Sequence, residues 1–378
     1  MAVVEETHAI LSPSSADRWM LCPGSVPYNL VRTKSSAAAD EGTAAHKLAE
    51  LALTNETDPI VYEGEEYKGV VFSEEMVGEV RKYTEFVSRL AETTGGDILI
   101  EQKLDISGIT GEVGAKGTAD AVILTSEELI VIDLKYGRGV EVAAVDNRQL
   151  RIYALAALEE YRIHVTQVRL IIFQPRMNNY PEWVVPIDDL LQFGAEVAAA
   201  AAHTRAANPP RIPGEKQCKW CNGKATCPEL EAYVDEALTI PPNAEAIRLA
   251  DALRKVDLAV EWGKAVWAYA SNFAETGDIP GRKLVLGKQG NRAWSDEGLA
   301  EEVMKSMKLK MDEMYTKKVI SPTVAEKLLA DSPKRWSRIS ALITRPDAKP
   351  TLVLDSDKRP AIARKDALEF DDETDVMG

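Results

Sequence analysis

The residues best suited to chemistry stand on two neighbouring segments of the chain. Asp120 lies in KGTADAVILT, and Asp133 and Lys135 lie in the next segment, ELIVIDLKYG. The 13 positions between the two aspartates suit adjacent antiparallel strands joined by a short turn. Asp133 and Lys135 are two apart, so we expect both side chains on one face of their strand and Leu134 in the core.

Two carboxylates beside a lysine suit metal-assisted hydrolysis of a phosphodiester bond. Carboxylate oxygens hold a hard divalent cation, Mg²⁺ or Mn²⁺. The cation polarises the phosphate and lowers the pKa of a bound water. The lysine can position or deprotonate that water, or stabilise developing charge. A structural Asp–Lys pair on a sheet surface is the alternative, because the Asp-x-Lys pattern is common.

The cysteines form a second constellation. Cys218, Cys221 and Cys227 follow one another as C-x₂-C-x₅-C, and Cys22 is the one remaining thiol of the sequence. Such close spacing lets one loop place three thiolates around a single centre, with Cys22 as the fourth ligand. By spacing alone, four thiolates fit either a structural Zn²⁺ or an iron–sulfur cluster.

The apolar pattern predicts the elements that position these residues. Helices are expected over about 40–53, 74–93, 145–161 and 189–207, and strands over 97–106, 116–125, 128–137, 167–175 and 183–187. This order predicts an α/β core with a central mixed sheet flanked by helices.

Four blocks along these elements resemble the PD-(D/E)xK nuclease superfamily, most closely its RecB-like branch with the Cas4 and AddB nucleases. The blocks are GTAAH at 42–46, GTAD at 117–120, IDLK at 132–135 and QLRIY at 149–153. They occur in the family's order. The resemblance implies a PD-(D/E)xK restriction-endonuclease-like core.

The resemblance also implies roles for the polar residues of these blocks. Asp120 and Asp133 would be the core metal ligands, together with the carbonyl oxygen of Leu134. His46 would be a further metal ligand, and Lys135 would be the catalytic lysine. A histidine on an Ala/Leu helix is otherwise more often a packed core residue.

The same resemblance extends to the helix after the strands. Gln149 and Tyr153, four positions apart, would position the metal site or the DNA backbone. Without the resemblance they are an ordinary amphipathic helix face. Glu101, in the strand expected at 97–106, is a weaker candidate, because it is equally a solvated strand residue.

One cysteine before the core and C-x₂-C-x₅-C after it resemble the iron–sulfur centre of the AddB and Cas4 nucleases. The resemblance implies a structural [4Fe–4S] cluster on Cys22, Cys218, Cys221 and Cys227, with Zn²⁺ as the alternative. It would tie an N-terminal helix to the end of the domain. The neighbouring lysines are either phosphate contacts or solvated loop charges: Lys216, Lys219 and Lys224.

The composition limits the class of protein. A formal net charge of −15 over 378 residues argues against a broad basic protein that coats nucleic acid, but not against a local basic groove. Four basic residues near the carboxylates are expected phosphate contacts: Lys116, Arg138, Arg148 and Arg151. We see neither an apolar run long enough for a membrane span nor a secretory signal, so we expect a cytoplasmic protein.

We expect two parts, a nuclease domain with its four-cysteine centre over 1–237 and a mainly helical extension with an acidic tail over 238–378. The extension should contain a long helix over 243–276 and a short hairpin over 280–295. The whole chain resembles an uncharacterised phage and prophage family with such a core and extension.

These observations predict a metal-dependent DNA nuclease, most simply an exonuclease in phage or prophage recombination or DNA processing. The alternative is a catalytically silent DNA-binding or scaffold protein that retains the fold. The expected partners are DNA and a phage single-strand annealing protein or another recombination protein.

Overall fold

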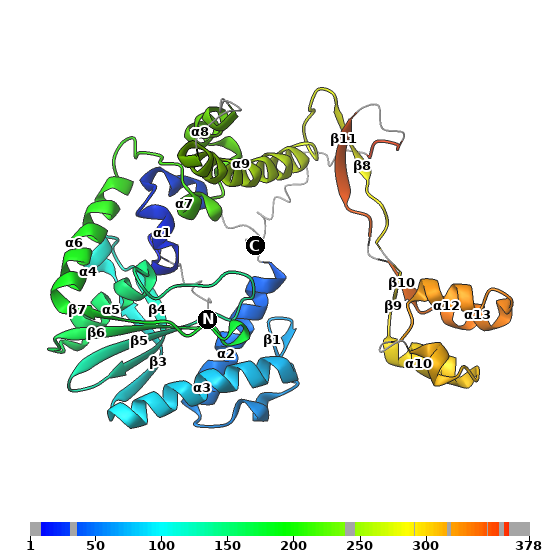
Figure 1. Ribbon diagram of the computed structural model, residues 1–378, viewed down its shortest axis with the longest axis horizontal. Coiled ribbons are helices and arrows are strands. Elements are labelled where there is room, and N and C mark those ends of the chain that lie inside the picture. The colour runs from blue at the N-terminus through cyan, green and yellow to red at the C-terminus, as the bar shows by residue number, and fades with distance from the viewer. Residues whose placement is uncertain are drawn as a thin grey trace, which may run out of the picture. The chain divides into compact units, whose positions relative to one another are not determined.

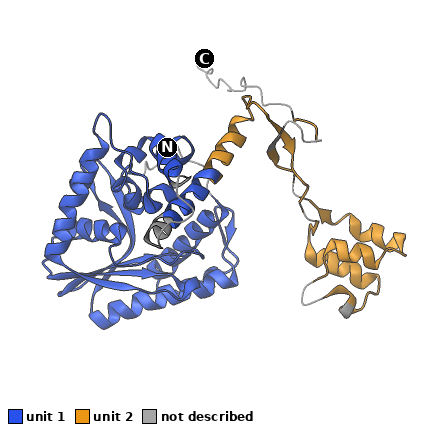
Figure 2. Cartoon of the chain, turned by 45° about the horizontal axis from the view of Figure 1, so that its top comes forward, with its two compact units in different colours: residues 1–263 blue, residues 264–378 orange. Residues whose placement is uncertain are grey.

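The computed structural model describes residues 9–30, 36–238, 246–290, 292–315, 319–345, 347–354 and 359–362. They belong to two compact units, Met1–Gly263 and Lys264–Gly378 (Figure 2). The boundary predicted after residue 237 adjoins residues 239–245, which lie outside the described residues, as does the acidic tail at 363–378.

A five-stranded mixed sheet forms the centre of the first unit. Its strands, in spatial order, are β3 (Asp97–Asp105), β4 (Lys116–Leu124), β5 (Glu128–Leu134), β6 (Gln167–Phe173) and β7 (Glu182–Pro186). The β5–β6 pair is parallel and the other three pairs are antiparallel. The predicted mixed sheet and the antiparallel neighbours that carry the two aspartates are therefore confirmed.

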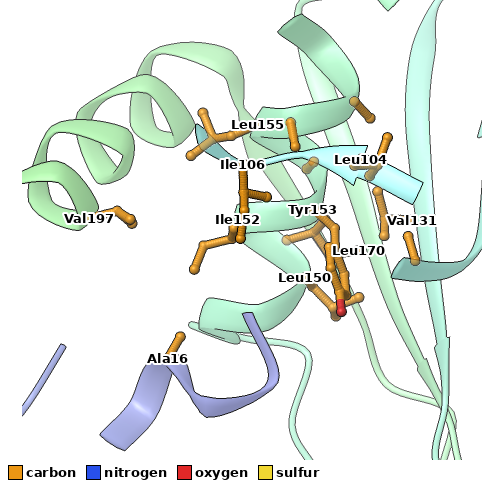
Figure 3. Close-up of a cluster of buried hydrophobic side chains, with 14 of the residues drawn as sticks. Ala16, Leu104, Ile106, Val131, Leu150, Ile152, Tyr153, Leu155, Leu170 and Val197 are labelled. Atoms are coloured by element: carbon orange, nitrogen blue, oxygen red, sulfur yellow. The ribbon is translucent and has the colours of Figure 1, made fainter. Parts of the chain in front are cut away.

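Helices cover both faces of this sheet (Figure 1). One face carries α2 (Ala37–Thr54) and α3 (Glu74–Thr94), and the other carries α5 (Arg148–Tyr161) and α6 (Ile187–Thr204). We call the buried side chains on these faces the α2–α3 layer and the α5–α6 layer, and Figure 3 shows part of the latter. Helix α5 is the crossover that the parallel β5–β6 pair requires.

Local signals fix where these helices begin and end. Ser36, Ser73 and Asn147 cap α2, α3 and α5, and each side chain accepts the backbone N–H of the residue three positions on. A cap of this kind stabilises a helix by about 1 kcal/mol. Gly95 ends α3 with a left-handed φ of 63°, which glycine adopts without steric cost.

Short elements complete the first unit. They are η1 (Pro13–Ser15), α1 (Ala16–Trp19), η2 (Pro23–Ser25), η3 (Pro27–Asn29), η4 (Pro59–Tyr62), β1 (Glu66–Tyr67), β2 (Val70–Val71), α4 (Ser107–Thr110), η5 (Pro175–Met177), α7 (Glu215–Lys219), η6 (Lys224–Thr226) and α8 (Pro228–Leu238). Helices α1 and α7, far apart in the sequence, pack against each other (Figure 1).

The C-terminal region contains more strands than the sequence predicts. Its elements are α9 (Ala246–Phe273), which crosses the unit boundary, β8 (Arg282–Leu286), β9 (Ala293–Trp294), α10 (Glu297–Ser306), α11 (Met311–Met314), α12 (Pro322–Leu328), α13 (Pro333–Ser340), β10 (Ile343–Thr344) and β11 (Pro350–Leu354). The hairpin predicted over 280–295 is wrong, because β8 pairs with β11 and β9 pairs with β10. A local pattern cannot specify partners so distant in sequence. Among the described residues, no helix has the length and apolarity needed to cross a membrane.

Candidate metal site and cysteine cluster

The candidate site lies where strands β4 and β5 part. The two strands are paired from Leu124↔Leu129 to Ala121↔Ile132, and Asp120 and Asp133 follow directly after the last pair. The backbone N–H of Leu134 donates to Asp120 Oδ2 over 2.7 Å. The Asp120 carboxylate therefore accepts a backbone N–H of β5 at the point where the β4–β5 pairing ends.

Next to Asp120, the alternation of side chains along strand β3 switches from one face of the sheet to the other. Glu101 has a left-handed φ of 45°, which is uncommon for a residue other than glycine. Before it, Ile98 and Ile100 pack on the α2–α3 layer, whereas Leu104 after it packs on the α5–α6 layer. Such a backbone costs about 1–3 kcal/mol and tends to occur at functional sites.

His46, Glu101 and Asp120 converge on one point. A ring nitrogen of the histidine and one oxygen from each carboxylate lie within 4.8 Å of one another. His46 Nδ1 is 3.2 Å from Asp120 Oδ1 and 3.9 Å from Glu101 Oε1. Among the described residues, this is the one such group of three or more His, Cys, Asp or Glu ligands.

A second network adjoins this group. Lys135 Nζ is 2.8 Å from Asp133 Oδ2 and donates to Gln149 Oε1 over 3.0 Å. Gln149 Nε2 in turn donates to Asp133 Oδ1 over 2.8 Å. Tyr153, one helical turn beyond Gln149, is 5% exposed and packs in the α5–α6 layer. The prediction that Asp133 and Lys135 lie on the same face of their strand is therefore confirmed. Helix α5 contacts this pair through Gln149.

The structure groups a different carboxylate with Asp120 than the sequence favours. Glu101, the weaker candidate, joins His46 and Asp120, while Asp133 is 2% exposed and held by Lys135 and Gln149. The direct ligand role of Asp133 therefore stays a prediction. So does that of the Leu134 carbonyl, although the predicted burial of the Leu134 side chain is confirmed.

Burial and neighbouring charges shift the pKa values of the residues in this site. Burial raises the pKa of Glu101 to about 7, and the charge of Asp120 adds to the effect. Burial alone would lower the pKa of His46, but the charge and hydrogen bond of Asp120 raise it to about 9. Burial raises the pKa of Asp133. At Asp120 burial also acts to raise the pKa, but the combined effects of His46, Lys135 and the Leu134 backbone N–H lower it. Metal ligation requires deprotonated ligands, so a bound cation would displace the protons of His46 and Glu101.

Tyr83 on α3 is a site residue that the sequence pattern misses. It is 1% exposed, and its hydroxyl has no hydrogen-bond partner within the part of the chain that the structure describes. Burial, then the charges of Asp120, Glu101 and Asp133, raise its pKa well above the ordinary value. The helical period of α3 predicts a core residue at position 83. The one sequence feature that could have indicated a polar role is the phenol hydroxyl within an otherwise apolar helix face.

Basic side chains near the site are mostly engaged. Arg138 and Arg148 each form an ion pair with a carboxylate. The Arg151 guanidinium lies 3.7 Å from the ring centroid of Phe193. Lys116, at the start of β4, is exposed. Phosphate contact by these four residues stays a prediction.

All four cysteines line one cavity, the cysteine cluster. Cys22 precedes η2, and the other three are supplied by the segment from α7 to the start of α8. The backbone N–H of Ile212 donates to Cys22 Sγ over 3.3 Å. Burial raises the pKa of Cys218 to about 11, so this thiol needs a cationic centre to become a thiolate.

The sulfur spacing bears on which centre fits. No three of the four Sγ atoms, all within the described residues, lie within 4.8 Å of one another. In a tetrahedral zinc site with Zn–S bonds of about 2.3 Å, every sulfur pair would be ~3.8 Å apart. Because thiol side chains can rotate toward a bound ion, the choice between Zn²⁺ and an iron–sulfur cluster stays a prediction.

Fold and site together define a mixed α/β protein with a candidate divalent-cation site and a four-cysteine cluster. A family model described as "Protein of unknown function (DUF2800)" matches residues 8–360, and the chain belongs to this family. A solved structure titled "Crystal structure of SSO0001" is similar at 19% identity over 60% of this chain and 89% of that chain, with a TM-score of 0.27.

Proposed function

We propose that this protein is a metal-dependent DNA nuclease with a PD-(D/E)xK-type core. One observation carries the proposal: His46, Glu101 and Asp120 converge within 4.8 Å beside a carboxylate–lysine pair on the adjacent strand. A merely structural Asp–Lys pair would not need a histidine and a left-handed glutamate gathered next to it.

The chain's own residues fit the roles that hydrolysis requires. His46, Glu101 and Asp120 would hold Mg²⁺ or Mn²⁺, because carboxylate oxygens suit both ions. The bound cation would polarise the phosphate and acidify a water. Asp133 and Gln149 fix the Lys135 ammonium beside this position, where it can stabilise negative charge that develops on the phosphate.

The finer assignment rests on the sequence resemblance. It favours an exonuclease in phage or prophage recombination or DNA processing, with DNA and a single-strand annealing or other recombination protein as partners. A catalytically silent DNA-binding or scaffold protein is the alternative. The intact Asp133–Lys135–Gln149 network favours the enzyme, because a scaffold has no use for a buried carboxylate–lysine pair.

We propose that the cysteine cluster holds a structural [4Fe–4S] centre rather than Zn²⁺. The placing of all four cysteines around one cavity and the resemblance of C-x₂-C-x₅-C with one upstream cysteine to the iron–sulfur nucleases support this assignment. Iron and acid-labile sulfide should both be present in anaerobically purified protein. Stoichiometric zinc without sulfide would contradict it.

Paired variants test the nuclease. Asp120→Ala and Lys135→Ala should each lower Mn²⁺-dependent DNA cleavage by about 10²–10³-fold or more, because each removes charge stabilisation in the site. Lys82→Ala, which alters an exposed lysine paired with Glu79 on α3, should cleave normally. Circular dichroism and iron content should match the wild type in all three. Normal cleavage by both site variants would refute the assignment.

A further inference from the structure

Trp220 is the most exposed of the seven tryptophans. It lies between Cys218 and Cys221, and 72% of it is accessible to solvent. Tryptophan is usually well buried, because its large apolar surface is costly to leave in water. The indole of Trp220 therefore offers a large flat aromatic ring to solvent on the cysteine loop.

The cysteine loop, residues 211–227, holds this indole in place. The backbone N–H of Trp220 donates to the carbonyl oxygen of Cys218, and Asn29 both accepts from the backbone of Asn222 and donates to Cys221 Sγ. Gly223 packs so closely on Tyr28 that an added Cβ would lie 2.3 Å from its ring. The backbone next to the indole is therefore anchored on the segment that contains Tyr28 and Asn29.

The charge around Trp220 is basic, although the protein as a whole is acidic. Lys219 Nζ lies 5.5 Å from the indole ring centroid. Lys216 and Lys219 are exposed, and neither forms an ion pair with any carboxylate in the described ranges. Arg138 and Arg148, by contrast, are already paired with carboxylates. The cysteine loop thus combines an exposed indole with two lysines that pair with no carboxylate of the described residues, one of them over the indole ring.

We propose that Trp220, Lys216 and Lys219 form a binding surface for single-stranded DNA, an inference that rests on the proposed nuclease function. A base would stack on the indole while the lysines bind the adjacent phosphates, the combination that proteins use to hold single strands without reading sequence. The cysteine cluster would then have a second role, which is to fix this surface on the domain.

Fluorescence anisotropy of a labelled oligothymidylate tests the surface. Full-length protein, purified anaerobically, is titrated without added divalent cation so that no cleavage occurs. Trp220→Ala should weaken binding by about 5- to 150-fold, which corresponds to the ~1–3 kcal/mol that one stacked base contributes. Trp220→Phe should restore most of the affinity. The wild type and Trp220→Ala should bind an abasic oligonucleotide equally.

Two further variants separate stacking from charge. Trp267→Ala is the matched control, because Trp267 is 51% exposed and has Arg282 at 5.0 Å from its ring but lies outside the cysteine loop. It should bind normally. The double variant Lys216→Ala/Lys219→Ala should reduce the slope of log affinity against log salt by about 0.7 for each phosphate that the protein no longer binds.

Equal binding by wild type and Trp220→Ala, or an equal loss in Trp267→Ala, would overturn the stacking surface. Adding Mn²⁺ to the same wild-type samples distinguishes the two proposals. Cleavage with unaltered binding by Trp220→Ala would remove the stacking surface and leave the nuclease standing. A wild type that neither binds nor cleaves would refute the nuclease itself.

Discussion

The two candidate centres of this protein are built in opposite ways. Asp120 and Asp133 are 13 positions apart and are brought together by adjacent strands of a buried sheet. Cys22 and Cys218 are 196 positions apart and lie on short helices and loops. The sheet positions the carboxylates whether or not a cation is bound, whereas the cysteine cluster joins two segments that are far apart in the sequence.

This contrast predicts that folding stability depends mainly on the cysteine cluster and that activity depends on the strand site. Losing one carboxylate from the strand site would remove chemistry and about 3–5 kcal/mol of folding energy at most, because its buried partner is left unpaired. Losing the centre that we propose on the cysteines would remove binding energy that is also folding energy.

The cysteine cluster should dominate stability. Cys221→Ser should lose iron and sharply lower the thermal midpoint of the first unit, because structural metal centres contribute on the order of 10 kcal/mol to folding. Asp133→Ala should keep its iron and lower the midpoint far less, because only the contacts with Lys135 and Gln149 are lost. Calorimetry with iron analysis measures the two together, and a Cys221→Ser midpoint equal to wild type would remove the contrast.

The identity of the second carboxylate ligand is the next test. Glu101→Gln should weaken Mn²⁺ binding by about 10–100-fold or more, since even indirect supports of a metal ligand have effects of that size. Glu50→Gln alters a neighbouring carboxylate that pairs with Lys47 on α2 and should bind Mn²⁺ normally. Isothermal titration calorimetry measures the Mn²⁺ affinity. An unchanged affinity in Glu101→Gln would indicate that Asp133, not Glu101, is the second carboxylate ligand.

Metal affinity should rise with pH. Because the pKa of His46 is about 9 and that of Glu101 about 7, both hold protons at low pH that the cation must displace. Mn²⁺ affinity should increase by about tenfold per pH unit between roughly 7 and 9, where one proton is displaced, and level off above that range. His46→Ala should flatten this dependence. A wild-type affinity independent of pH would show that His46 is not a ligand.

The smallest effect is expected at Tyr83. Tyr83→Phe removes a buried hydroxyl for which the described residues offer no partner, so it should stabilise the metal-free protein by about 1–3 kcal/mol. Its effect on cleavage tests whether the hydroxyl acts on Asp120, Glu101 and Asp133, whose charges contribute to its raised pKa. Tyr180→Phe, at an exposed tyrosine, should change neither quantity. Stabilisation with full activity would reduce Tyr83 to a packing residue.

The sequence predicts the strand site well because its geometry is local. Alternation along two neighbouring strands is enough to place Asp133 with Lys135 and to bring Asp120 next to them. Helix periodicity likewise places Gln149 on α5, which the structure brings against Asp133.

The rest of the site depends on features that no local pattern specifies. The left-handed backbone at Glu101 breaks the alternation on which strand predictions rely. The direction of the Tyr83 hydroxyl depends on how α3 packs on the sheet. The pairing of β8 with β11 joins distant segments, so the hairpin rule fails there for the same reason.

A nuclease assay with wild type beside Asp133→Ala tests the central claim most directly. Linear and closed circular DNA, single- and double-stranded, are incubated with cluster-loaded protein and Mg²⁺ or Mn²⁺. We predict degradation of linear substrates alone, lost in Asp133→Ala and in EDTA. Degradation that persists in Asp133→Ala, or no cleavage of any substrate by the wild type, would contradict the account.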